Sequence, residues 1–178
     1  MPPLGSTPVY FGNFLVTSQV FHKTAHSFAL VNIKPLLPGH VLVSPLRTAR
    51  RLSDLDHAEI TDLFLTVQQV GKMVERVYGA SSLNIAIQDG PAAGQSVPHL
   101  HTHIIPRQSA DLDEQGGSDA IYGLLEGEDG DVGRHLWENS RKRPKFPAVD
   151  DSTRKPRTEP EMAEEAQKLA LEMTRQHL

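Results

Sequence analysis

Three histidines at strictly alternating positions constrain this chain of 178 residues more than any other feature. His99, His101 and His103 are separated by single residues, and Ile104 and Ile105 follow them. Because neighbouring side chains of a β-strand point to opposite faces, a strand over residues 100–105 would place the three imidazoles on one face. The residues between them would point the other way, into an apolar core.

Three imidazoles on one face suit two kinds of chemistry. One is metal binding, since histidine is a common ligand of zinc and copper. The other is nucleophilic catalysis at phosphorus, in which one imidazole attacks while its neighbours fix its tautomer and donate to phosphate oxygens. A chance cluster of polar residues is the third interpretation, and the strict alternation disfavours it. The preceding residues 88–98 are rich in Gly, Pro and amides, and glycine lets backbone approach a ligand closely.

The histidine run resembles the motif of the histidine triad superfamily, in which histidines alternate with apolar residues. Thr102 stands where an apolar residue is usual, but it is β-branched and suits a strand. Two further segments resemble the fragile histidine triad branch of diadenosine polyphosphate hydrolases. They are Gln88-Asp89-Gly90-Pro91 with Gly94-Gln95, and Ile33-Lys34-Pro35 with Pro38-Gly39-His40-Val41-Leu42-Val43. The resemblance runs from about Phe11 to Arg107.

The resemblance implies a fold and an activity. The fold is α+β, with an antiparallel sheet, one main helix and a C-terminal helix, and two such domains pair as a homodimer. The activity is hydrolysis of diadenosine triphosphate to AMP and ADP through a covalent adenylyl-histidine. The substrate would arrive with a divalent cation, Mg²⁺ or Mn²⁺, and no prosthetic group is expected. Alternatives are a nucleoside phosphoramidase of a sibling branch, a metal-binding protein, and a signalling module whose nucleotide-bound state is the output.

The same resemblance assigns roles to the histidines. His101 would be the nucleophile, with its second ring nitrogen donating to a main-chain carbonyl near His99. His103 would contact the phosphate oxygens and the departing bridge oxygen, and His99 would support and orient. His40 would lie beneath the triad and hold the other imidazoles in place without taking part in the chemistry.

Substrate contacts are also implied by the resemblance. Gln88 would bind the ribose and the α-phosphate and is expected among the catalytic residues with the three histidines. Gln95 and Ser96 would bind the rest of the polyphosphate chain. The ribose and base contacts would come from Asn32, Leu30, Phe11 and Leu15. Phe11 and Leu15 suit a plain core equally well, and Asn32 could instead cap the end of its strand.

Patterns of apolar residues predict the elements that carry these side chains. Strands are expected over residues 28–33, 40–44 and 83–87, with a strand or hairpin over 9–16. A capping box of Asp56 and Glu59 predicts a long helix that ends at Gly79. A second start signal, Thr158 with Pro160 and Glu161, predicts a C-terminal helix to about residue 176.

These predictions divide the chain into three regions. Residues 1–108 form the histidine triad catalytic core, residues 109–157 a flexible, charged insertion containing Gly and Pro, and residues 158–178 a helix that packs on the core or on a dimer partner. Tyr122 stands where the branch has a loop tyrosine, as a regulatory or substrate contact or as an ordinary loop residue. His135 and Trp137 could form one small docking point.

Composition narrows the class of protein. Hydrophobic residues at 38% can supply a core, and a net charge of -4 argues against general nucleic-acid binding through a basic surface. The chain has no cysteine, no segment like a secretory signal at its start and no apolar run long enough for a membrane span. We therefore expect a protein of the cytoplasm, with the nucleus as a second compartment.

Overall fold

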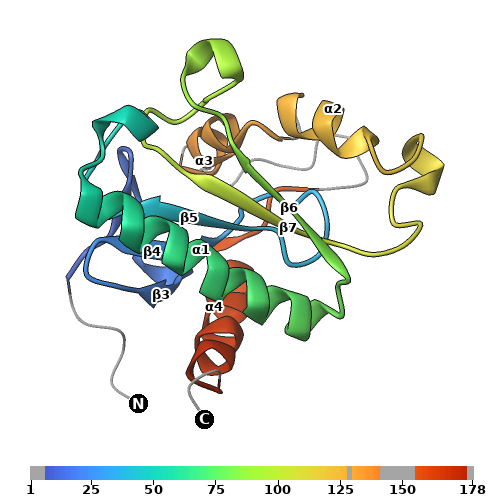
Figure 1. Ribbon diagram of the computed structural model, residues 1–178, viewed down its shortest axis with the longest axis horizontal. Coiled ribbons are helices and arrows are strands. Elements are labelled where there is room, and N and C mark those ends of the chain that lie inside the picture. Colours follow the sequence, from blue (N-terminus) through green and yellow to red (C-terminus); the bar gives the residue numbers. More distant parts are fainter. Residues whose placement is uncertain (1–6, 128–129, 141–154, 176–178) are drawn as a thin grey trace.

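A five-stranded antiparallel sheet forms the centre of the computed structural model, which describes residues 7–127, 130–140 and 155–175 (Figure 1). Its strands, in spatial order, are β3 (Val20–Lys23), β4 (Ser27–Val31), β5 (Val41–Pro45), β7 (Thr102–Arg107) and β6 (Ser82–Ile87). A small hairpin of β1 (Tyr10–Phe11) and β2 (Phe14–Leu15) precedes it. In the connections, the described residues form the 3-10 helices η1 (Thr17–Gln19), η2 (Leu52–Asp54), η3 (Pro91–Ala93) and η4 (Asp113–Gln115).

The strand expectations are largely confirmed, with shifts of a few residues. The strand expected to reach residue 33 ends at Val31, and the next begins at Val41 rather than at residue 40. The histidine-bearing strand begins only at Thr102, because residues 99–101 pair with no neighbouring strand. Strand β3 was not expected, since its residues form a short run that includes a histidine and a lysine.

The main helix α1 (His57–Tyr78) begins and ends where its capping residues predict. The Asp56 carboxylate accepts from the Glu59 backbone N–H at 2.9 Å, and the Glu59 carboxylate accepts from the Asp56 backbone N–H at 3.0 Å. Gly79 ends the helix with a φ of 62°, a left-handed conformation that favours glycine.

Helix α1 lies on the face of the sheet that the histidines do not occupy. His103 pairs with Leu42 on β5 and with Ala86 on β6, so these side chains share one face. Leu83, three residues before Ala86, points to the other face, and a Cβ added at Gly71 of α1 would lie 3.0 Å from its Cδ1. The sheet therefore separates α1 from the triad.

Residues 109–127 and 130–140 have more regular structure than expected. They contain α2 (Ala120–Glu126) and α3 (Val132–Ser140), so a flexible, largely solvated insertion is wrong for these two helices. Helix α2 buries a small apolar cluster with Leu36, Ile105, Leu112, Ile121 and Leu125, whereas Val132 and Leu136 of α3 join the main core. Each helix presents a pair of buried apolar residues four positions apart, which is the helical signal in this segment. The rest of the expected insertion, apart from residues 155–157, lies outside the described residues.

The C-terminal helix α4 (Glu159–Thr174) follows its predicted start signal. The Thr158 backbone N–H donates to the Glu161 carboxylate at 2.7 Å, as in a capping box. The helix contacts β3, β4 and α1 of the same chain, below the sheet in Figure 1, which is one of the two packing options expected. No helix within the described residues has the length and apolar character needed to span a bilayer.

Candidate active site

The three histidines converge at the start of β7. His101 and His103 have ring centroids 5.0 Å apart, and Phe11 of β1 packs with its ring centroid 5.1 Å from that of His101. All three imidazoles are buried, as are Leu100 and Thr102 between them. The alternation therefore brings the imidazoles together as predicted, although only the last of them is within the strand.

His99 is held from both sides by backbone groups. The Gly12 N–H donates to His99 Nδ1 at 2.9 Å, so Nδ1 carries no proton and Nε2 does. Nε2–H then donates to the Pro45 carbonyl at 2.7 Å. Burial lowers the pKa of His99 and keeps the ring neutral. With both nitrogens bonded to backbone, this ring has an orienting role and no free atom for a ligand.

His101 has the opposite tautomer, which leaves its outer nitrogen free for attack. Its Nδ1–H donates to the His99 carbonyl at 2.9 Å, the main-chain bond that the family resemblance implied. Nε2 consequently carries a lone pair. Burial lowers the pKa of His101 to about 4, so the ring stays neutral at pH 7.

The tautomer of His103 is set by two groups behind it. The Leu36 N–H donates to His40 Nδ1 at 3.1 Å, which places the His40 proton on Nε2. That proton points at His103 Nδ1, 2.9 Å away, so His103 must carry its own proton on Nε2. This N–H finds no acceptor among the described residues. His103 therefore presents a hydrogen-bond donor beside the lone pair of His101, and burial lowers its pKa well below the usual value.

This pattern of nitrogens does not suit a metal. A metal ion needs several lone pairs that converge, whereas the triad offers the lone pair of His101, a donor on His103 and nothing on His99. Among the residues that the structure describes, no three His, Cys, Asp or Glu side chains are placed to hold a metal ion. The arrangement instead combines a nucleophile with an adjacent donor, which is what attack on a phosphate ester or anhydride requires.

The glycine-rich loop before the triad is closely packed. A Cβ added at Gly94, whose φ is +89°, would lie 2.6 Å from the amide nitrogen of Gln88. Gln95 braces the same loop, since its oxygen accepts from the Gly90 N–H at 3.0 Å and its nitrogen donates to the Arg50 carbonyl at 2.8 Å. The Gln95 amide is thus bonded within the protein, whereas the family resemblance implied a substrate contact.

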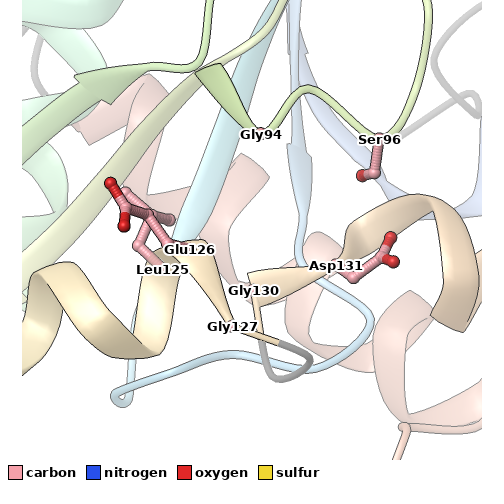
Figure 2. Close-up of a pocket in the computed structure, with 7 residues that line it drawn as sticks. All are labelled: Gly94, Ser96, Leu125, Glu126, Gly127, Gly130 and Asp131. Carbon is pink, nitrogen blue, oxygen red and sulfur yellow. The ribbon is translucent and has the colours of Figure 1, made fainter. Parts of the chain in front are cut away.

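Gln88 and Ser96 face the two short helices of residues 120–140. The Gln88 amide donates to the Leu125 carbonyl at 3.4 Å, and the Ser96 hydroxyl accepts from the Gly133 N–H at 3.0 Å. A pocket of about 260 Å³ opens between the loop and these helices (Figure 2). Its lining comprises Gly94, Ser96, Leu125, Glu126, Gly127, Gly130 and Asp131. This wall, formed by α2 and α3, was not predicted from the sequence.

The expected base and ribose contacts differ in their surroundings. Asn32 is buried beside His40, its Nδ2 3.3 Å from His40 Nε2, and its side-chain oxygen accepts from the Lys34 N–H at 3.0 Å. Leu30 is buried in β4, whereas Leu15 on the β1–β2 hairpin is 57% exposed. Tyr122 is also exposed. Trp137 is exposed but His135 is buried, so these two side chains do not form the single docking point expected.

The site and the sheet define a histidine triad domain. The model of the HIT domain family matches residues 14–110, and the chain belongs to this family. It is 48% identical over 168 residues to the bis(5'-nucleosyl)-tetraphosphatase (asymmetrical) of Schizosaccharomyces pombe, a match that covers 89% of this chain and 91% of that relative.

Two further matches agree with the fragile histidine triad branch. The chain is 51% identical over 135 residues to the bis(5'-adenosyl)-triphosphatase of Saccharomyces cerevisiae, covering 75% of this chain and 64% of that protein. The solved structure of Plasmodium falciparum diadenosine triphosphate hydrolase is 34% identical, with a TM-score of 0.59, and the match covers 78% of this chain and 90% of that one.

Proposed function

We propose that this protein is a dinucleoside polyphosphate hydrolase that cleaves diadenosine triphosphate to AMP and ADP. The observation that carries the proposal is the pair of opposite tautomers at the end of the triad. His101 holds a free lone pair on Nε2 because its Nδ1–H is bonded to the His99 carbonyl. His103 holds a free N–H because His40 donates to its other nitrogen. The named activities of the relatives support the same substrate class.

The first step transfers a nucleotidyl group to the protein. His101 Nε2 attacks the α-phosphorus, a nitrogen–phosphorus bond forms, and the bond from phosphorus to the bridging oxygen breaks. ADP leaves with the electron pair of that bond. The His103 N–H donates to the oxygen that gains this charge. The imidazole of His101 becomes positive in the adduct, and the His99 carbonyl that accepts from its Nδ1–H stabilises the charge.

The second step releases AMP. Water attacks the same phosphorus, the nitrogen–phosphorus bond breaks, and the water loses a proton to solvent. His101 returns to its neutral form, which a pKa of about 4 favours at neutral pH. The polar loop of residues 88–96 lies beside this centre, where we place the rest of the phosphate chain with Gln88 and Ser96 as its nearest contacts.

The substrate enters, in this proposal, as a complex with Mg²⁺ or Mn²⁺. A dinucleoside triphosphate carries several negative charges, and a divalent cation neutralises them before the neutral imidazoles meet the α-phosphate. The cation therefore belongs to the substrate, with no resident metal on the triad. Removal of divalent cations with EDTA should abolish turnover, and added Mg²⁺ should restore it.

We also propose a homodimer built on strand β6. It forms one edge of the sheet and presents Ile85 at 51% exposure. An exposed edge with an apolar side chain favours pairing with a second copy across a two-fold axis. Ile85→Lys should shift the protein from dimer to monomer in sedimentation velocity, and an unchanged dimer would exclude this edge.

The decisive assay is hydrolysis of diadenosine triphosphate with Mg²⁺, resolved by chromatography, for wild type, His101→Asn and the exposed control His57→Asn. We expect equimolar AMP and ADP from wild type and from the control, and a loss of about 10⁴-fold or more in kcat for His101→Asn. Normal turnover by His101→Asn would exclude it as the nucleophile. If wild type does not hydrolyse diadenosine triphosphate but cleaves an adenosine phosphoramidate, it has the activity of the sibling branch. Assaying diadenosine tetraphosphate in parallel shows which length of phosphate chain the protein prefers.

A further inference from the structure

The loop of residues 32–40 carries a site residue at each end. Asn32 stands at its start, after β4, and His40 at its end, before β5. The family resemblance implies that Asn32 contacts the ribose, while His40 donates to His103 at 2.9 Å and so fixes the tautomer of that ring. The position of this loop therefore sets the positions of Asn32 and His40 together.

Arg157 binds the first end of the loop from a distant part of the chain. Its backbone N–H donates to the Ile33 carbonyl at 2.8 Å, and its Nε donates to the Asn32 carbonyl at 3.1 Å. A second guanidinium nitrogen, Nη2, donates to the same Asn32 carbonyl. Two donors on one carbonyl fix its direction better than a single flexible ammonium would.

Glu165 of α4 connects Arg157 to the other end of the loop. Its carboxylate forms an ion pair with Arg157 Nη1 and accepts from the Tyr78 hydroxyl at 2.7 Å. Burial, together with Glu165, raises the pKa of Tyr78, so the phenol remains a donor. The side chains of Arg157 and Glu165 are only 20% and 19% exposed, which limits screening of the pair by water.

Tyr78 packs directly on the second end of the loop. A Cβ added at Gly39 would lie 2.5 Å from the Tyr78 ring, so the ring rests on the backbone immediately before His40. Gly39 has a φ of +83°, which also favours glycine at this turn. The three side chains of Arg157, Glu165 and Tyr78 thus contact both ends of one loop and join them through a single carboxylate.

We propose that Arg157 is a positioning residue for the nucleotide site. It holds the Asn32 end of the loop directly and the His40 end through Glu165 and Tyr78, and it thereby connects helix α4, drawn in red in Figure 1, to the histidine triad. The inference rests on the proposed function for what His40 does and on the family resemblance for what Asn32 does. The contacts of Arg157, Glu165 and Tyr78 with the loop are properties of the fold.

A second arginine offers a matched control. Arg76 also joins α1 to α4 through a carboxylate and a carbonyl, donating to Glu172 Oε2 at 2.5 Å and to the Glu172 carbonyl at 2.9 Å. These bonds involve no residue of the 32–40 loop. Arg76→Ala removes a comparable link between α1 and α4 and leaves the contacts of Arg157 and Tyr78 with the 32–40 loop in place.

The test compares Arg157→Ala, Arg157→Lys and Arg76→Ala at a temperature where circular dichroism shows each to be folded. For diadenosine triphosphate with Mg²⁺ we expect kcat/KM to fall about 10- to 100-fold in Arg157→Ala, and by less than about twofold in Arg76→Ala. Arg157→Lys keeps the positive charge but lacks the two guanidinium donors to the Asn32 carbonyl, so its loss of kcat/KM should be intermediate. Added guanidine hydrochloride, at millimolar concentration, should partly restore Arg157→Ala alone.

Nitrogen-15 NMR of the imidazoles gives a readout that does not depend on turnover. Wild type and Arg76→Ala should show single tautomers of His40 and His103, with Nε2 protonated in each, whereas Arg157→Ala should show mixed tautomers. Unchanged tautomers and kcat/KM in Arg157→Ala would overturn the proposal and leave a structural link only. If Arg157→Ala does not fold, Arg157→Lys decides between the two results. A wild type inactive on the substrate, with the tautomers altered as expected, would instead reject the proposed function.

Discussion

His40 Nε2 and His103 Nδ1 lie 2.9 Å apart in the buried interior, and the direction of the proton between them follows from the backbone. Because the Leu36 N–H occupies His40 Nδ1, the proton is on His40 and points at His103. His103 then turns its own N–H toward the reaction centre. A backbone amide thus determines, through two rings, which atom the protein offers to a departing phosphate.

Replacing His40 tests this chain of tautomers. His40→Phe keeps a ring but removes the donor, so His103 loses the partner that orders its tautomer, and we expect kcat to fall about 10²-fold or more. His40→Gln, whose amide can still donate, should retain more activity. Steady-state kinetics on both folded variants measure the difference, and equal activity of the two would show that the donor is not needed.

Buried neutral imidazoles also predict how pH acts. The pKa of His101 is about 4 in the folded protein and about 6.5 when unfolded, so its contribution to stability is complete above pH 6.5 and is lost as pH falls toward 4. At pH 5.5 this histidine alone should lower the free energy of unfolding by about 1 kcal/mol. The value of kcat/KM should be constant between pH 6 and 8. Urea unfolding at pH 7.5 and 5.5, with a pH–rate profile, measures both, and a half-loss of activity near pH 6.5 would contradict the low pKa.

Gly94 should be intolerant of a side chain for two separable reasons. Gly94→Ala places a Cβ 2.6 Å from the Gln88 amide and also strains a φ of +89°. Gly116→Ala is the control, since its φ is +108° and no atom lies within 4 Å of the added Cβ. Both should lose about 1 kcal/mol of stability from backbone strain. Only Gly94→Ala should lower kcat/KM, by about tenfold or more, and equal kinetics for the two variants would argue against close packing at Gln88.

The one departure from the apolar pattern of the motif predicts a stabilising substitution. Thr102 is fully buried, and its hydroxyl has no hydrogen-bond partner among the described residues. Thr102→Val replaces this hydroxyl with a methyl group of similar size, so we expect the free energy of unfolding to rise by about 1 kcal/mol with unchanged kcat. Thermal and urea unfolding measure the change. A less stable variant would indicate that the hydroxyl has an acceptor.

The sequence predicted the elements that depend on local signals. Helix α1 begins at its Asp56 cap and ends at Gly79, and the alternation predicted that the imidazoles converge, although only His103 is within the strand. The tautomers could not be predicted from the sequence, because they depend on backbone groups of Gly12, Leu36 and Pro45, which only the folded chain brings to the rings. Helices α2 and α3 were missed because glycines and charges dominate their segment and mask two short apolar pairs.

The backbone contacts of His99 carry a consequence for how its motif tolerates change. A ring that accepts from Gly12 and donates to Pro45 acts as a spacer with one acceptor and one donor, and an amide side chain offers the same two functions. In a library randomised at all three histidines, functional clones should therefore admit glutamine at position 99 more readily than at position 101. His99 and His101 are the same residue type in the same motif, yet they should tolerate substitution unequally.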